Sequence, residues 1–182
     1  MKYRFPAVMK WTAALTLAAA FICFFAFYLY QKAWILTLAI TFFTTCYHFS
    51  MRLLIGHLVP NKFDFHARWF QPKSFEPALY QKLRLRKWKK YIPTYNPDSF
   101  SLASNSLEQI LQNMCQAEVV HLLIIAASFL PLLFSFLWDS FGVFLGTSLI
   151  SAAFDLVFVI AQRYNRPRFL RLLAKNTGRL SQ

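Results

Sequence analysis

Four stretches of the sequence are almost free of charged residues and long enough to cross a lipid bilayer, over residues 11–30, 33–55, 119–138 and 140–162. At about 1.5 Å of rise per residue, twenty helical residues span roughly the 30 Å of the hydrocarbon layer. Lipid offers no hydrogen bonds to a peptide group, so a backbone in that layer must be helical. Each stretch is therefore predicted to be a transmembrane α-helix.

Two very short connections join these spans in pairs. Gln31 and Lys32 separate the first span from the second, and Asp139 separates the third from the fourth. So brief a connection leaves an antiparallel neighbour as the only arrangement. We therefore predict an all-α integral membrane protein with four transmembrane helices in two hairpins, forming a single membrane domain over residues 1–182.

The composition and the placement of charge support this picture. Apolar residues make up 57% of the chain, and the formal net charge is +13. Nineteen of the twenty lysines and arginines lie before the first span, between Arg52 and Lys90 or after the fourth span, and only Lys32 lies in a turn on the other side. By the positive-inside rule, we expect a multi-pass protein of the cell membrane with both termini, the loop 60–118 and the tail 163–182 in the cytosol.

Nucleic-acid binding and metal binding are both less favoured by the sequence. In a basic protein that binds nucleic acid the aromatic residues form a stacking surface, whereas here most of the apolar surface lies in lipid spans. The three cysteines are scattered without CxxC spacing, and the histidines match no metal-ligand motif. We expect no nucleic acid partner and no metal. The four histidines are His48, His57, His66 and His121.

The segment between the hairpins mixes aromatic residues with lysines and arginines. From Phe75 to Ile92, apolar residues recur roughly every four positions, which predicts an amphipathic helix lying on the membrane with its cations toward anionic headgroups. Pro93 is expected to end it. These cations either only anchor the protein or also receive a phosphorylated or acidic substrate. Further on, Asn105-Ser-Leu-Glu108 is typical of a helix start, and this helix is predicted to run into the third span.

Three titratable residues stand within or beside the spans, where such side chains are costly and rare. Glu118 and His121 are three residues apart and share one helix face, an arrangement in which a carboxylate can orient a histidine base. The alternative is an interfacial histidine satisfied by a neighbouring helix. Asp155 lies roughly 10 Å inside the cytosolic boundary at Gln162 by helical rise. It either serves the site or packs helices together through a hydrogen bond.

Three arginines follow the fourth span within six residues, in Gln162-Arg-Tyr-Asn-Arg-Pro-Arg168. Guanidinium groups suit the recognition of phosphate or carboxylate. The competing interpretation is that they snorkel to the lipid headgroups.

From about Phe63 to Leu173, the chain resembles the glycosyl-diaponeurosporenoate acyltransferase family of bacterial membrane enzymes. Three motifs carry the likeness: Tyr80-Gln-Lys-Leu-Arg-Leu-Arg-Lys-Trp-Lys-Lys-Tyr-Ile-Pro93, Cys115-Gln-Ala-Glu-Val-Val-His121 and the arginine-rich motif from Gln162 to Arg168. The resemblance implies transfer of a fatty acyl group to a sugar hydroxyl of a carotenoid glycoside or another glycolipid. Membrane lipids, the glycosylated acceptor and an acyl-CoA or acyl-carrier-protein donor would be the partners, and no further cofactor is needed.

This reaction needs a base, donors for the oxyanion and a slot for the acyl chain. We expect His121, oriented by Glu118, to be catalytic. The expected substrate-binding residues are Trp88, Lys89, Asp155, Arg163, Tyr164, Asn165, Arg166 and Arg168. No His-x4-Asp motif and no Gly-x-Ser-x-Gly elbow are present. Two alternatives stay open: a non-enzymatic membrane scaffold, and a small membrane methyltransferase or reductase.

Overall fold

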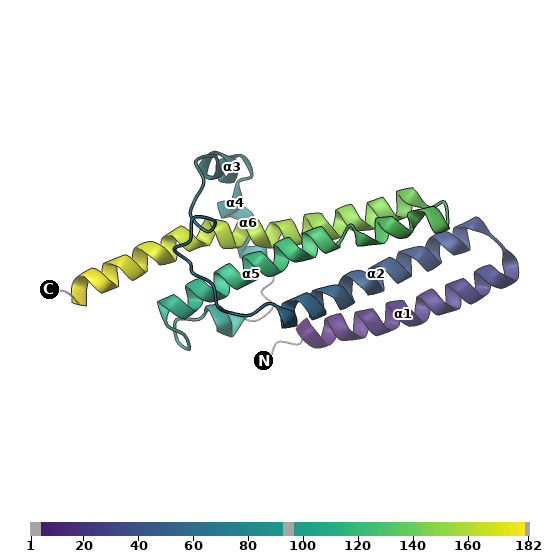
Figure 1. Ribbon diagram of the computed structural model, residues 1–182, viewed down its shortest axis with the longest axis horizontal. Helices are drawn as coiled ribbons and strands as arrows, with labels where there is room; N and C mark the ends of the chain where they lie inside the picture. The colour runs from purple at the N-terminus through teal and green to yellow at the C-terminus, as the bar shows by residue number, and fades with distance from the viewer. Residues whose placement is uncertain (1–4, 93–96, 181–182) are drawn as a thin grey trace. The chain divides into compact units, whose positions relative to one another are not determined.

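The computed structural model describes residues 5–92 and 97–180, and every regular element in these ranges is a helix (Figure 1). Four of them are long and apolar enough to cross a membrane: Pro6–Tyr30, Ala33–Leu58, Leu107–Leu137 and Phe141–Asn176. These helices confirm the prediction of an all-α membrane protein with four spanning segments.

The chain packs as two compact units, and helices α5 (Leu107–Ala127) and α6 (Phe141–Leu180) contribute to both. Unit 1 comprises Met1–Leu58 and Leu123–Asp155, and unit 2 comprises Val59–Leu122 and Leu156–Gln182. The single domain expected over residues 1–182 stays a prediction.

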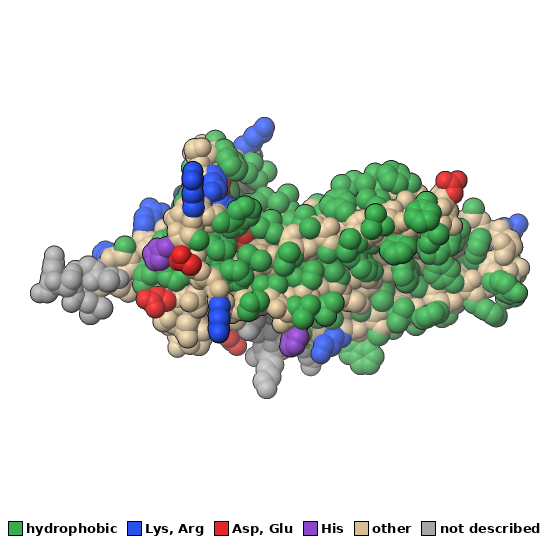
Figure 2. All heavy atoms as spheres, in the orientation of Figure 1, with side chains coloured by type: hydrophobic (Ala, Val, Ile, Leu, Met, Phe, Trp, Pro, Cys, Tyr) green, Lys and Arg blue, Asp and Glu red, His purple; other side chains and the backbone are tan. Residues whose placement is uncertain are grey.

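In unit 1, helices α1 (Phe5–Tyr30) and α2 (Ala33–Leu58) lie side by side and run in opposite directions (Figure 1). The chain reverses at Gln31, whose φ of 50° is left-handed. The ring of Phe24 lies 6.5 Å from that of Phe43 on α2. Many large apolar side chains on these helices remain exposed, among them Trp11 and Phe21, and Figure 2 shows a hydrophobic surface along them. Such a surface is suited to lipid.

The third span changes helix type part of the way along. Its α-helical part, α5, ends at Ala127, and a 3-10 helix, η3 (Leu130–Leu137), follows. Pro131 lies in the first turn of η3, where it cannot donate the hydrogen bond that would continue the α-helix. The α-helix predicted over residues 119–138 is therefore correct only in its first half.

Helix α6 is much longer than the predicted fourth span. It begins at Phe141, after the left-handed Asp139, and continues to Leu180 instead of ending at Gln162. Pro167 lies inside it and removes one backbone hydrogen bond without ending the helix. The described part of the predicted tail is therefore helical, and the arginine-rich motif is carried on a rigid element.

In unit 2, the single helix predicted from Phe75 to Ile92 is wrong. The segment forms three short helices, α3 (Glu76–Lys82), α4 (Leu85–Trp88) and the 3-10 helix η1 (Lys89–Tyr91). The break lies at Arg84, whose φ of 50° no α-helix can accommodate. It changes the direction of the chain, so Leu85 becomes fully buried. Pro93 lies outside the described residues, and the membrane-surface position of the segment stays a prediction.

A 3-10 helix, η2 (Pro97–Phe100), precedes α5, which starts one residue later than its sequence suggests. The cap is Ser106, whose hydroxyl accepts from the Gln109 amide at 3.2 Å, while Gln109 Oε1 accepts from the Ser106 amide at 3.1 Å. This reciprocal pair is a capping box. From there α5 runs without interruption toward the third span, as predicted.

Candidate active site

A largely buried cluster of four charged side chains lies within unit 2. Glu118 on α5 is fully buried, and each of its carboxylate oxygens accepts a hydrogen bond from a different arginine of α6. Arg163 Nη1 donates to Oε1 at 2.6 Å, and Arg166 Nη2 donates to Oε2. Arg166 is almost as buried as its partner, with 1% of its side chain exposed. Two of the three arginines that follow the predicted fourth span thus bind protein carboxylate.

Glu76, at the start of α3, supplies the second carboxylate. Its Oε1 accepts from Arg163 Nε at 2.8 Å and lies 2.6 Å from Arg163 Nη2. Arg163 therefore bridges Glu76 and Glu118, and two positive charges balance two negative ones. Burial of an isolated charge would cost several kcal/mol, so this cluster depends on its pairing being complete.

The two guanidinium groups also hold the loop that precedes α3. Phe70 O accepts from Arg166 Nη1 at 3.0 Å, and Gln71 O accepts from Arg163 Nη2 at 3.2 Å. The Phe70 ring lies 5.0 Å from the Arg166 guanidinium carbon, in a cation–π contact. The arginines therefore tie this loop to α5, α6 and α3 at one point.

A second set of polar side chains borders this cluster. Tyr80 Oη donates to Glu76 Oε2 at 2.9 Å, and the Tyr80 ring meets the Tyr164 ring edge-to-face at 5.2 Å. Lys89 Nζ lies 4.7 Å from the Tyr164 ring centroid and donates to Asn165 Oδ1 at 2.9 Å. Tyr164 therefore contacts both a phenol and an ammonium group.

Tyr80 and Lys89, which both belong to this second set of polar side chains, have shifted pKa values. Burial, and then the hydrogen bond and negative charge of Glu76, raise the pKa of Tyr80 above its usual value. Burial, and then the positive charges of Arg168 and Arg86, lower the pKa of Lys89. Tyr80 therefore stays a phenol at neutral pH, and Lys89 gives up its proton more readily than an ordinary lysine.

His121 lies one turn after Glu118 on α5. Its ring stacks on that of Phe158, with centroids 4.6 Å apart and planes 8° apart. Both carboxylate oxygens of Glu118 accept hydrogen bonds from arginines. Any orienting effect of Glu118 on His121 therefore comes from a carboxylate that is already held in place. The catalytic roles of His121 and Glu118 stay predictions.

The expected substrate-binding residues fall into four places. Arg163, Tyr164, Asn165, Arg166 and Lys89 gather around the cluster of unit 2. Trp88 instead forms a hydrogen bond within its own segment: its Nε1 donates to the carbonyl oxygen of Leu83, the residue after α3, at 2.8 Å.

Asp155 belongs to unit 1, where it forms an ion pair with Arg52 of α2. Arg52 Nη2 also donates to Ser151 Oγ at 2.8 Å. The described contacts of Asp155 thus fit the helix-packing alternative, and they add Arg52 as a partner that sequence reasoning missed.

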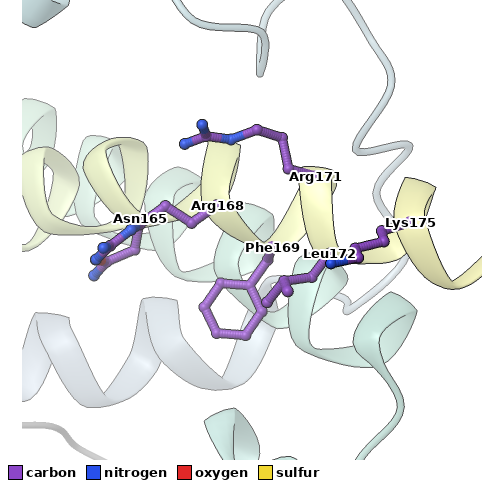
Figure 3. A pocket seen from close by; sticks show the side chains of 6 residues that line it. All are labelled: Asn165, Arg168, Phe169, Arg171, Leu172 and Lys175. Atoms are coloured by element: carbon purple, nitrogen blue, oxygen red, sulfur yellow. The ribbon is translucent and has the colours of Figure 1, made fainter.

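Arg168 lines a pocket along α6 (Figure 3). The lining residues are Asn165, Arg168, Phe169, Arg171, Leu172 and Lys175. They lie on successive turns of α6 over a broad face of the helix, and include three cations and two apolar side chains; in Figure 3 the Arg171 side chain points away from Phe169. Such a surface suits an anionic group attached to an apolar one.

Sequence reasoning also missed Glu76 and Tyr80 as members of the site. The chain has only seven acidic residues against twenty basic ones, so every glutamate near the basic motifs had abundant cations within reach. That scarcity was the available signal, but it does not say which arginine each glutamate meets. Among the residues that the structure describes, no three His, Cys, Asp or Glu side chains come together as a metal site would require.

Comparison with known proteins places this site in a family. No curated protein and no solved structure matches the chain. The family model for glycosyl-4,4'-diaponeurosporenoate acyltransferase matches residues 66–175, a range that contains Glu76, Glu118 and His121. The match covers more than half of the chain and favours an acyltransferase over a scaffold, a methyltransferase or a reductase. The chain belongs to the glycosyl-4,4'-diaponeurosporenoate acyltransferase family and is a membrane acyltransferase.

Proposed function

We propose that the protein esterifies a sugar hydroxyl of a glycosylated carotenoid, or of a closely similar glycolipid, with a fatty acyl group from a cytosolic thioester. The observation that carries this proposal is the buried Glu118 cluster next to His121, inside the matched region. A rigid ionic centre gives the adjacent face of α5 and α6 the fixed geometry that acyl transfer needs.

The step uses His121 as a general base. Its imidazole takes the proton of the sugar hydroxyl while the hydroxyl oxygen attacks the thioester carbonyl carbon. The tetrahedral intermediate then collapses, the C–S bond breaks, and the thiolate leaves with the proton from the imidazolium. The products are an acyl ester and a free thiol, so no oxidant or further cofactor enters.

The developing oxyanion needs hydrogen-bond donors. Arg166 is too buried to touch a substrate, so its role is to hold Glu118. The Lys89 ammonium group and the amide of Asn165 are better placed, because both are partly exposed and already held by their mutual hydrogen bond. Glu118 and Glu76 both bind the guanidinium group of Arg163, so they act as positioning residues that hold Arg163 in place.

The pocket along α6 is proposed to receive the acyl donor. Arg168 and Lys175 would bind phosphate groups, and Phe169 and Leu172 would contact an apolar part of the donor (Figure 3). Acyl-CoA and acyl carrier protein both carry a phosphate at the end of the pantetheine arm opposite the thioester. The same chemistry therefore serves either source.

One assay tests the function and separates the donors. The purified full-length protein in micelles is given a glycosylated carotenoid and either radiolabelled palmitoyl-CoA or radiolabelled palmitoyl carrier protein, and the lipids are separated by chromatography. We expect label in an acyl ester of the acceptor with one donor and not the other. A series of acceptors that resemble the glycosylated carotenoid less and less, down to an alkyl glucoside, then shows which acceptors the enzyme uses. Absence of any acylated glycolipid with both donors would overturn the proposal.

We also propose that this chemistry takes place on the cytosolic side of the cell membrane. The distribution of lysine and arginine supports this orientation. In a variant without native cysteines, single cysteines at Lys32 and Asp139 should react with an impermeant maleimide added to intact cells. Cysteines at Lys82 and Lys175 should react only after the cells are opened. The reverse pattern would invert the topology.

A further inference from the structure

Two polar stripes run along the buried faces of spanning helices in unit 1. Within each stripe, successive residues are three or four positions apart, so the stripe occupies a single helix face. The stripes are Thr44, His48 and Arg52 on α2, and Ser148, Ser151 and Asp155 on α6. Polar groups in spanning helices are costly, and two matching stripes therefore call for a function.

The stripes meet at the ion pair of Arg52 and Asp155. Arg52 Nη2 also donates to Ser151 Oγ at 2.8 Å, and Ser151 Oγ lies 2.9 Å from Ser128 Oγ on the segment after α5. Helices α2 and α6 run in the same direction (Figure 1). His48, one turn before Arg52, therefore lies at the level of Ser148, one turn before Ser151.

At this level the buried polar atoms lack hydrogen-bond partners. Both ring nitrogens of His48, the Ser148 hydroxyl and Arg52 Nε have none, and the only other such side-chain atom among the described residues is Arg166 Nε. His48 is 5% exposed and Ser148 is fully buried. Leaving such groups unpaired is expensive, so four of them within one helical turn of each other indicate a place built to hold a polar group.

The charges in this layer define what that group can be. Arg52 is already neutralised by Asp155, so an anion would add an unbalanced charge among buried side chains. A neutral imidazole offers one donor and one acceptor, a serine hydroxyl offers both, and Nε of Arg52 offers a donor. A hydroxyl or ester carbonyl group complements this set without adding charge.

We propose that unit 1 holds a second binding site, in which His48, Ser148 and Arg52 receive the uncharged oxygen-bearing head of a lipid. The helices that carry the site have hydrophobic outer surfaces, so a ligand reaches it through the lipid phase (Figure 2). The site lies in a different unit from the acyl-transfer cluster and does not depend on the proposed reaction.

The test observes His48 directly. The full-length protein, labelled with ¹⁵N-histidine, is placed in dodecylphosphocholine micelles, whose detergent has neither hydroxyl nor carbonyl groups. It is titrated with 1-monooleoylglycerol, and with 1-octadecene as a matched hydrocarbon control. The His48 resonances are assigned by their loss in His48→Gln. We expect monooleoylglycerol to shift them saturably, while His57 and His66 do not move and octadecene has no effect.

Ser148→Ala provides the matched variant, because the change removes one hydroxyl and little volume. We expect it to raise the half-saturation concentration several-fold with an unchanged melting temperature. An unchanged His48 signal, the same shift with octadecene, or equal binding by Ser148→Ala would overturn the proposal and assign these atoms to water. Since the readout is not activity, this failure is separate from failure of the acyl-transfer assay.

Discussion

Arg166 and Glu118 form an ion pair in which both side chains are withdrawn from the surface, with 1% and 0% of their area exposed. Neither residue can be removed without leaving the other charge buried. This pair, extended by Arg163 and Glu76, makes the stability of unit 2 depend on a few charged atoms.

We predict that Glu118→Gln lowers the stability of the protein by about 3–5 kcal/mol, because two guanidinium groups lose their shared partner. Thermal unfolding in micelles, followed by circular dichroism, measures the effect. Glu108→Gln, on the exposed side of the first turn of α5, is the matched control and should stay within about 0.5 kcal/mol of the wild type. If both variants unfold alike, the cluster does not stabilise the fold.

His121→Gln should reduce acyl transfer by roughly 10²–10⁴-fold, the range over which a positioned base contributes. The fold should persist, since the partner of the His121 ring in the stack is an apolar phenylalanine. Turnover with saturating donor and acceptor is the measurement, and the exposed His66→Gln is the control. Activity of His121→Gln within a few-fold of the wild type would show that another group takes the proton.

The pKa of Lys89 provides a test of the surface around the pocket. Burial and the charges of Arg168 and Arg86 lower this pKa. Folded protein therefore binds fewer protons than unfolded protein between the lowered pKa and about 10.4, and stability rises with pH in that window. Arg168→Gln should raise the pKa of Lys89 and narrow the window, because it removes a positive charge.

The midpoint of Lys89 acetylation by acetic anhydride against pH, measured by peptide mass spectrometry, reports the pKa of Lys89. Arg171→Gln is the matched control, since Arg171 lies on the same helix but does not shift Lys89. An equal midpoint in the Arg168→Gln variant and the wild type would contradict the electrostatic account.

The break at Arg84 predicts an unusual order of substitutions. With φ at 50°, glycine is favoured there and a β-branched residue is not, so Arg84→Gly should stay within about 1 kcal/mol of the wild type while Arg84→Val loses more. At Arg86, inside α4, the order should reverse because valine is the better helix former. Melting temperatures of the four variants decide this, and the same order at both positions would place Arg84 in a helix.

Much of the architecture follows from the sequence alone. Long apolar runs specify spanning helices because the lipid leaves the backbone no other way to satisfy its hydrogen bonds, and the described part of the chain contains four such helices. The arginine-rich motif and the Cys115–His121 motif likewise indicated the family. These are local signals, readable from composition and spacing within a short window.

The partners of the charged residues were decided only by the tertiary structure. Sequence spacing placed Glu118 and His121 on one face, but Glu118 is 45 residues from Arg163 and 48 from Arg166, and packing brings both arginines to it. In the same way, Asp155 meets Arg52, more than a hundred residues away. A periodic pattern specifies which face a side chain occupies. Which opposite charge it meets depends on how distant helices pack, and that information is absent from any short window of sequence.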